Sequence, residues 1–350
     1  MSDPPPEEGQ HCPVCGRPVG PDDRFCEADG TPLGAGAGPP PAPPTVCACG
    51  VGAGEDGGDG FCSRCGMRLV AAAGPEDEGT GEALAPAPDL GAGTHVGRSH
   101  PTDEDAVAVG RRQRDGNPLH AIVVCDGVSS SSHGEQASAH AARAALAVLV
   151  DAADGAAPLD PEGALRAAVA AAHRAACEAA IELVPEKDPP GTTLVAALAH
   201  AGRVDVAWVG DSRAYLVGPP LADGSALTAT ALTRDHSWVN MVVDAGQMTE
   251  AEAMHSPYAH ALVHCLGPLE DPDPTHCPEP SVGHVSAERG SRLVVCSDGL
   301  WNYAPSPEDI AALLARPAPG SDARTIAWDL IHHALAMGGH DDVTVAVALL

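Results

Sequence analysis

The chain has 350 residues, 44% of them apolar, and a formal net charge of −29 at pH 7. This length is enough for about two domains with a buried core, and the excess of acid argues against nucleic acid or an anionic membrane surface as a partner, because phosphate contacts need clustered Lys and Arg. No apolar run approaches the roughly 20 residues of a membrane span, and the first residues lack the pattern of a signal peptide, so we expect a cytoplasmic protein without a membrane span.

Cysteines are concentrated at the start of the chain, where pairs of the form Cys-x-x-Cys lie near further cysteines. In a cytosolic chain this spacing is typical of structural zinc rather than of disulfides. One set offers four thiolates, with an unusually tight Cys-x-Cys pair: Cys47, Cys49, Cys62 and Cys65. The other set is one thiolate short: Cys12, Cys15 and Cys26. Asp29 or His11 could supply its fourth ligand. Reduced surface cysteines or redox pairs are the alternative.

The two cysteine sets predict two small zinc ribbons, over residues 1–33 and 46–70, with a Pro/Gly linker over residues 34–45 between them. The arrangement is similar to the double zinc-ribbon modules of bacterial signalling proteins. Each unit is too small to bury a sufficient core, so bound zinc would supply the free energy of folding. Residues 71–93, rich in Gly, Ala, Pro and acid, predict a disordered acidic linker, and we place the second domain over residues 94–350.

The second domain begins with strand signals. A pair of acids precedes an apolar run at residues 106–109, and residues 110–118 suggest a hairpin loop. Residues 121–125 form a short apolar run of the kind that suits a strand buried on both faces, and this run stops at Asp126-Gly127. The same design returns at residues 293–299, which end in Asp298-Gly299.

Helices and further strands follow in an order that predicts an α+β fold. Helical spacing is seen over residues 134–151, 161–183, 306–314 and 323–337, and a mostly helical insert runs to residue 253. Residues 194–217 predict an antiparallel meander, and residues 343–350 a final strand. Strands gathered in meanders and helices gathered in pairs indicate a layered α+β fold rather than a doubly wound parallel sheet.

Isolated acids stand at strand ends or Gly-bounded turns in five distant segments. They are Glu104, Asp105, Asp126, Asp211, Asp298, Asp341 and Asp342. If they converge, their mutual repulsion requires a neutralising cation, and ligation by oxygen alone selects Mg²⁺ or Mn²⁺ over zinc. Two such ions suit the hydrolysis of a phosphate ester.

Seven short segments, taken together and in order, resemble the metal-dependent Ser/Thr protein phosphatases of type 2C, the PPM family. The segments are residues 103–106, 126–135, 191–193, 210–215, 232–237, 296–300 and 339–344. The resemblance implies a four-layer αββα sandwich, in which two antiparallel sheets are flanked by helix pairs. It therefore agrees with the layered fold indicated by the pattern of strands and helices.

The resemblance also implies roles for the acids. Asp126 would bridge two metals, with the carbonyl of Gly127 on one of them, while Asp298 and Asp341 would complete the other. Glu104 and Asp105 would act through metal-bound waters. Asp211 would help Asp298 to hold a third, weaker metal.

Arg98 is the candidate clamp for the phosphate, because a guanidinium group matches two phosphate oxygens, with Arg111 or Arg112 as alternatives. The general acid is left open, and His133 is the nearest histidine in sequence to the site. The chain departs from the family pattern at several positions: residues 129–131 and Asp103, His264 and Asp342.

The resemblance thus implies a Mn²⁺- or Mg²⁺-dependent protein serine/threonine phosphatase that works through a metal-bound hydroxide. Its expected partners are phosphorylated proteins, including a protein kinase or its substrates, and we expect a monomer. The alternative is a phosphatase-like interaction protein that binds partners through its zinc ribbons with little or no catalysis.

Overall fold

The computed structural model describes residues 10–11, 18–19, 81–98, 101–129, 131, 133–182, 189–220, 226–259, 261–268, 275–318 and 320–350. The chain divides into two compact units, Met1–Gly79 and Thr80–Leu350. In the first unit, β1 (Gln10–His11) and β2 (Pro18–Val19) pair antiparallel. The cysteines and Asp29 of the predicted zinc ribbons lie outside the described residues, as does the linker over residues 34–45.

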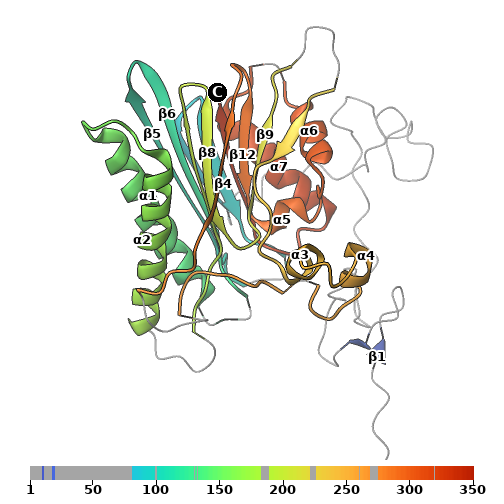
Figure 1. The fold of residues 1–350 in the computed structure, drawn as a ribbon. Helices are drawn as coiled ribbons and strands as arrows, with labels where there is room; N and C mark the ends of the chain where they lie inside the picture. Colours follow the sequence, from blue (N-terminus) through green and yellow to red (C-terminus); the bar gives the residue numbers. More distant parts are fainter. Residues whose placement is uncertain are drawn as a thin grey trace, which may run out of the picture. The chain divides into compact units, whose positions relative to one another are not determined.

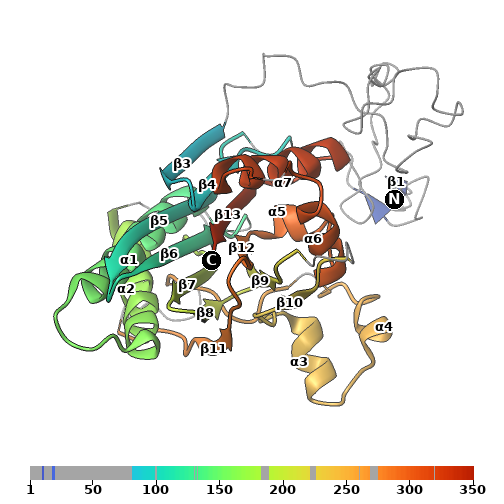
Figure 2. The same ribbon diagram turned by 90° about the horizontal axis from the view of Figure 1, so that it is seen from above.

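Two antiparallel sheets form the centre of the second unit (Figures 1 and 2). The six-stranded sheet has the order β10-β9-β12-β13-β4-β3, and the five-stranded sheet has the order β11-β8-β7-β6-β5. The strands of the first sheet are β3 (Gly81–Ala87), β4 (Leu90–His95), β9 (Arg213–Val217), β10 (Ala229–Ala231), β12 (Arg292–Cys296) and β13 (Val343–Leu349). The strands of the second sheet are β5 (Asp105–Arg114), β6 (Asn117–Asp126), β7 (Leu194–His200), β8 (Arg203–Val209) and β11 (Ser281–Ser286).

Helices cover the outer face of each sheet, so the predicted α+β sandwich is confirmed (Figure 1). The five-stranded sheet carries α1 (Gly134–Asp154) and α2 (Pro161–Glu182). The six-stranded sheet carries α5 (Asp298–Trp301), α6 (Pro307–Leu314) and α7 (Ala323–Met337). Two short helices, α3 (Trp238–Asp244) and α4 (Glu250–Ala253), lie in the insert between β10 and β11. None of the helices in the described part of the chain has the length and hydropathy that a bilayer crossing requires.

Burial on both faces explains the uninterrupted apolar run of β6. Val123 and Cys125 pack with the helices α1 and α2, whereas Ile122 and Val124 point into the layer between the two sheets. Because alternate side chains of a strand point to opposite faces, both faces must be apolar here. This central strand carries Asp126 at its end.

Two expectations about local structure need correction. The stretch predicted as a disordered linker, residues 71–93, is folded from residue 81 onward, because β3 pairs with β4 and β4 pairs with β13. Leu90 and Ala92 are fully buried in the layer between the sheets. The hairpin loop is also shorter than expected, since β5 continues to Arg114 and only Asp115 and Gly116 form the turn.

Candidate metal centre

Asp105 and Asp126 lie directly opposite each other where β5 and β6 meet at one end of the five-stranded sheet. Hydrogen bonds from the loop before β7 fix the backbone at Asp126. The Asp126 N–H donates to Thr193 Oγ1 at 3.1 Å, and the Thr193 N–H donates back to the Asp126 carbonyl at 2.8 Å. The Thr192 hydroxyl donates to the same carbonyl at 2.9 Å. These hydrogen bonds therefore fix the end of β6 without using the carboxylate of Asp126.

The carboxylate of Asp105 joins the two sheets. It is 8% exposed and accepts a hydrogen bond of 2.7 Å from the hydroxyl of Ser297, which precedes Asp298 at the start of α5. The same hydroxyl oxygen accepts the N–H of Thr344 on β13 at 3.0 Å. Segments almost 200 residues apart are thus tied together beside the acids.

The two acids before β13 have different environments. Asp342 is 2% exposed, and its carboxylate accepts the backbone N–H groups of Gly97 and Glu104, each at 2.6 Å. Asp341 is less buried, and its carboxylate accepts the N–H of Asp342 at 2.9 Å. Because the carboxylate of Asp342 accepts two backbone N–H groups, its role is to hold these backbone segments together. Asp341 is therefore the candidate metal ligand of the two.

Glycines permit a close approach of these segments. A Cβ atom on Gly127 would lie 2.6 Å from the carbonyl oxygen of Glu104 and 2.7 Å from the carbonyl carbon of Gly134. A Cβ atom on Gly299 would lie 1.9 Å from the carbonyl oxygen of Asp342. No side chain fits at either position, so the Asp-Gly pairs are needed to bring the acids together.

The acids interact electrostatically. Burial raises the pKa of Asp126 well above its usual range, and the carboxyl groups of Asp105, Asp298, Asp211 and Asp341 each raise it further. Burial, followed by the nearby charge of Asp103, raises the pKa of Asp105. Such a set is stable in its ionised form only if a cation neutralises it.

The donor chemistry at this end of the sheets fits a hard divalent cation. Carboxylate and carbonyl oxygens are the ligands of Mg²⁺ and Mn²⁺, and Mg²⁺ in particular retains several waters when it binds. In the part of the chain that the structure describes, no group of three or more His, Cys, Asp or Glu side chains is gathered closely enough to hold a metal ion by itself. An ion held by the predicted acids would therefore need water molecules among its ligands.

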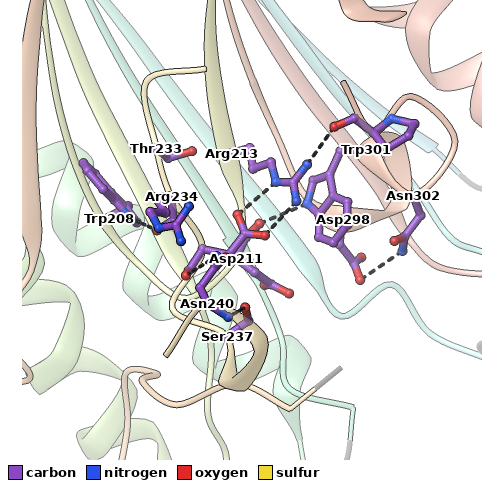
Figure 3. A network of polar contacts seen from close by, with 12 residues as sticks. Trp208, Asp211, Arg213, Thr233, Arg234, Ser237, Asn240, Asp298, Trp301 and Asn302 are labelled. Atoms are coloured by element: carbon purple, nitrogen blue, oxygen red, sulfur yellow. Dashed lines mark hydrogen bonds and ion pairs between the residues drawn. The ribbon is translucent and has the colours of Figure 1, made fainter. Parts of the chain in front are cut away.

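Asp211 belongs to a second polar network, centred on Arg213 (Figure 3). Burial, followed by the charge of Asp235, raises the pKa of Asp211 to about 7. The Arg213 guanidinium binds both carboxylate oxygens of Asp235, at 2.9 and 2.7 Å, and lies 3.7 Å from the ring centre of Trp301. The Trp301 indole donates to the Asp211 carbonyl at 3.0 Å. Since Trp301 is the last residue of α5, this network connects Asp211 to the helix that begins at Asp298.

The arginines predicted as phosphate clamps lie at very different distances from the acids. Arg111 forms an ion pair of 2.8 Å with Asp89, and Arg112 one of 3.0 Å with Asp154. Both lie six or more residues along β5 from Asp105, a distance of roughly 20 Å at the rise of a β-strand, so neither alternative is suitable. Arg98 is exposed, and its backbone N–H donates to the Gly339 carbonyl at 2.7 Å, beside the segment that carries Asp341.

His133 is a loop residue rather than an evident general acid. It has a left-handed φ of 60°, it precedes α1, and its exposed ring lies 3.3 Å from Glu135. The sequence analysis did not identify the hydroxyl groups of Ser297 and Thr193. For Ser297 the available signal was a polar residue directly before Asp298 at the end of an apolar run, whereas Thr193 has no acid beside it in the sequence.

Comparisons with known proteins show which family this chain resembles. Residues 92–331 match the family model described as protein phosphatase 2C. The chain is 34% identical over 249 residues to the serine/threonine protein phosphatase PstP of Mycobacterium tuberculosis, a match that covers 70% of this chain and 42% of that protein. It is 32% identical over 155 residues to the serine/threonine phosphatase stp of Listeria monocytogenes, covering 44% of this chain and 55% of that protein. The chain therefore spans about half the length of these curated relatives.

Solved structures show the same fold. The crystal structure of the M. tuberculosis phosphatase PstP/Ppp has a TM-score of 0.57 at 31% identity, and the match covers 77% of this chain and 99% of that one. The catalytic domain of PstP in complex with two manganese ions has a TM-score of 0.54 at 30% identity, covering 77% of this chain and 97% of that one.

Proposed function

The chain belongs to the protein phosphatase 2C family, and on this basis we propose that it is a manganese- or magnesium-dependent phosphatase that removes phosphate from phosphoserine and phosphothreonine in proteins. One observation carries the proposal: buried or half-buried acids from distant segments raise the pKa of Asp126 together, at the end of the central strand β6. The structural relative that contains two manganese ions supports the choice of metal.

The residues divide into ligands and supports. We assign Asp126, the Gly127 carbonyl, Asp298 and Asp341 to direct contact with the ions, Glu104 and Asp105 to contact through waters, and Asp211 with Asp298 to a third position. Asp105 also accepts the Ser297 hydroxyl, so its orientation is fixed before any ion binds. Bound divalent ions would supply an activated water and neutralise the phosphoryl oxygens.

Arg98 is the proposed phosphate contact. Its side chain is exposed and its backbone is held at Gly339, so the guanidinium can reach toward a substrate beside Asp341. The planar guanidinium can donate to two phosphate oxygens at once. We also propose that the protein acts as a monomer. Its proposed substrates are a protein kinase or the proteins that such a kinase phosphorylates.

Replacing Asp126 tests the assignment. Asp126→Asn removes a charge from the metal position, so it should abolish nearly all Mn²⁺-dependent hydrolysis of a phosphothreonine peptide and weaken Mn²⁺ binding in calorimetry. Asp151→Asn is the matched control, because Asp151 is an exposed acid on α1, and it should behave as wild type. Wild-type turnover by Asp126→Asn would disprove the site.

We further propose that the first unit binds up to two zinc ions through Cys12, Cys15, Cys26 and Asp29 and through Cys47, Cys49, Cys62 and Cys65. The support is the spacing of these residues in the sequence. Elemental analysis of reduced protein purified without chelators should find this zinc, and Cys62→Ser should lower the content by one equivalent. Protein that contains no zinc would refute the proposal.

A further inference from the structure

A cavity of about 700 Å³ lies at the end of the sheets opposite to the candidate metal centre. Its lining includes His120, near the start of β6, and Arg203, at the start of β8, whereas Asp126 ends β6. His120 and Asp126 are six positions apart on one strand, which is roughly 20 Å at the rise of a β-strand. In Figure 1 this end of the sheets is the one beside the marked C-terminus, since Leu350 also lines the cavity. The cavity is therefore separate from the metal centre.

Small side chains explain why this space is unfilled. Ala199 is buried in the apolar cluster between the two sheets, Ala287 and Leu350 pack against that cluster, and all three line the cavity. Packed sheets lie about 10 Å apart, and an alanine side chain reaches across only a small part of that gap. Gly202, in the turn between β7 and β8, adds no side chain at all. The result is a largely apolar cavity whose volume suits a small organic molecule.

Two histidine rings form a fixed part of the cavity wall. His120 is 2% exposed, and its Nε2 lies 3.2 Å from a carboxylate oxygen of Asp89. Burial lowers the pKa of His120, so this ring is neutral near pH 7. The His200 Nε2 donates to the Arg114 carbonyl at 3.1 Å. Burial holds the first ring and a hydrogen bond holds the second, so this part of the wall is formed before a ligand enters.

Arg203 offers the cavity a fixed hydrogen-bond donor. Its Nε and Nη2 donate to the carboxylate of Asp205 at distances between 2.6 and 3.0 Å, and the Asp205 side chain is only 7% exposed. Its Nη1 has no hydrogen-bond partner among the residues that the structure describes. The guanidinium group is thus oriented by a buried acid and keeps N–H groups for a ligand oxygen.

The charges around the cavity are balanced. Asp205 neutralises Arg203, and the other lining residues with a full charge, Glu288 and Arg289, are adjacent and have opposite signs. The chain as a whole has a formal net charge of −29, which disfavours the approach of an anion. A cation finds no unpaired acid among the buried lining residues that the structure describes. A neutral ligand with a hydrogen-bond acceptor therefore fits best.

We propose that this cavity binds a neutral, mainly apolar small molecule, such as an aromatic ketone, whose oxygen accepts a hydrogen bond from Arg203. The site is distinct from the candidate metal centre, and the inference does not depend on the proposed phosphatase function.

The probe for the test is Prodan, a neutral naphthyl ketone whose fluorescence shifts to shorter wavelength in apolar surroundings. Titrated into the full-length protein, it should bind saturably with this blue shift. Ala287→Phe adds a ring at a lining position, so it should weaken Prodan binding by about ten-fold. Arg203→Lys keeps a positive charge beside Asp205 but removes the donors of Nη1, so it should weaken binding by about five-fold.

Ala147→Phe is the matched control, because Ala147 is exposed on α1 and the same ring there lies outside the cavity, and it should leave the Kd of Prodan unchanged. Circular dichroism checks the fold of each variant, and Arg203→Lys decides the test alone if Ala287→Phe does not fold. The anionic dye anilinonaphthalene sulfonate, in competition with Prodan, should bind this site about ten-fold more weakly.

Three results would overturn the inference. The first is the absence of saturable Prodan binding. The second is an unchanged Kd in the folded cavity variants, which would place the dye elsewhere on the protein. The third is displacement of Prodan by the sulfonate at equal concentration, which would show that the site does not select a neutral ligand.

Discussion

The carboxylate of Asp342, which directly follows Asp341 in the chain, holds the backbone of a distant segment. It accepts two N–H groups, from Gly97 and Glu104, while the carboxylate of Asp341 accepts the N–H of Asp342. The carboxyl group of Asp341 also contributes to the raised pKa of Asp126. We therefore expect the neighbouring acids to perform separate tasks, one structural and one at the candidate metal centre.

The difference can be measured with two asparagine variants. Asp342→Asn places an NH₂ group against one of two backbone N–H donors, so the free energy of unfolding should fall by about 1–3 kcal/mol. Asp341→Asn should weaken Mn²⁺ binding more than Asp342→Asn does, because Asp341 is the proposed metal ligand of the two. Urea unfolding in EDTA and calorimetric Mn²⁺ titration give the two values, and an equal loss of metal affinity in both variants would contradict the division.

Asp211 should make the metal-free protein sensitive to pH. Its pKa in the folded state is raised to about 7, first by burial and then by Asp235. A raised folded-state pKa means that the folded protein retains a proton that the unfolded chain has lost, so this group lowers stability as pH rises from about 4 to about 7. Above that range the charged, buried carboxylate exerts its full destabilising effect.

Asp211→Asn removes this effect, because the amide does not ionise. In EDTA at pH 8 the variant should melt several degrees above the wild type, and the difference should shrink as the pH is lowered toward 4. Scanning calorimetry across this range checks the sign. Asp151→Asn on the exposed face of α1 provides the baseline, and a difference for Asp211→Asn that grows toward acid pH would show that the direction is wrong.

The pair formed by Arg213 and Asp235 should be strongly coupled. Their side chains are only 19% and 12% exposed, and the guanidinium also stacks on Trp301. Removing the arginine leaves a largely buried carboxylate without its partner, so Arg213→Ala should cost about 2–3 kcal/mol of stability. Adding Asp235→Asn should recover part of that loss, with a coupling energy of about 1–2 kcal/mol.

The exposed ion pair of Arg234 and Asp244 is the control for this double-mutant cycle. Both side chains are more than half exposed, at 57% and 62%, and the same cycle on them should give a much smaller coupling. Urea unfolding of the wild type and the six variants supplies all the values. Equal coupling for the two pairs would mean that burial and stacking on Trp301 contribute nothing to the network around Asp211.

The sequence predicted the central strands and their acids because their signals are local. An unbroken apolar run before Asp126-Gly127 has few interpretations other than a buried strand, and the same is true before Asp298-Gly299. The resemblance to the PPM family assigned Asp341 rather than Asp342 to the metal. The two backbone N–H groups that the Asp342 carboxylate accepts could not be predicted, because their donors lie 245 and 238 residues away in the chain.

The error at residues 81–93 has a different cause. This segment is rich in Gly, Ala and Pro, and its composition resembles that of a linker. Its strand β4 is stabilised by pairing with β13, more than 240 residues away, and by the burial of Leu90 and Ala92, while β3 pairs with β4. Such long-range pairing overrides local propensity and leaves almost no trace in the segment itself.

This correction sets the boundary for a truncation. The second unit begins at Thr80, and the residues of the candidate metal centre all lie within it, so a protein that starts at Thr80 should fold alone and hydrolyse a small aryl phosphate at close to the full-length rate. A protein that starts at Leu90 lacks β3, which leaves one edge of β4 without its partner strand and should lower the melting temperature. Circular dichroism melts and Mn²⁺-dependent turnover of both truncated forms test these expectations together.

If the form starting at Thr80 is folded but inactive toward the aryl phosphate, the first unit must complete or control the active site. If the form starting at Leu90 melts like the form starting at Thr80, β3 does not stabilise the sheet.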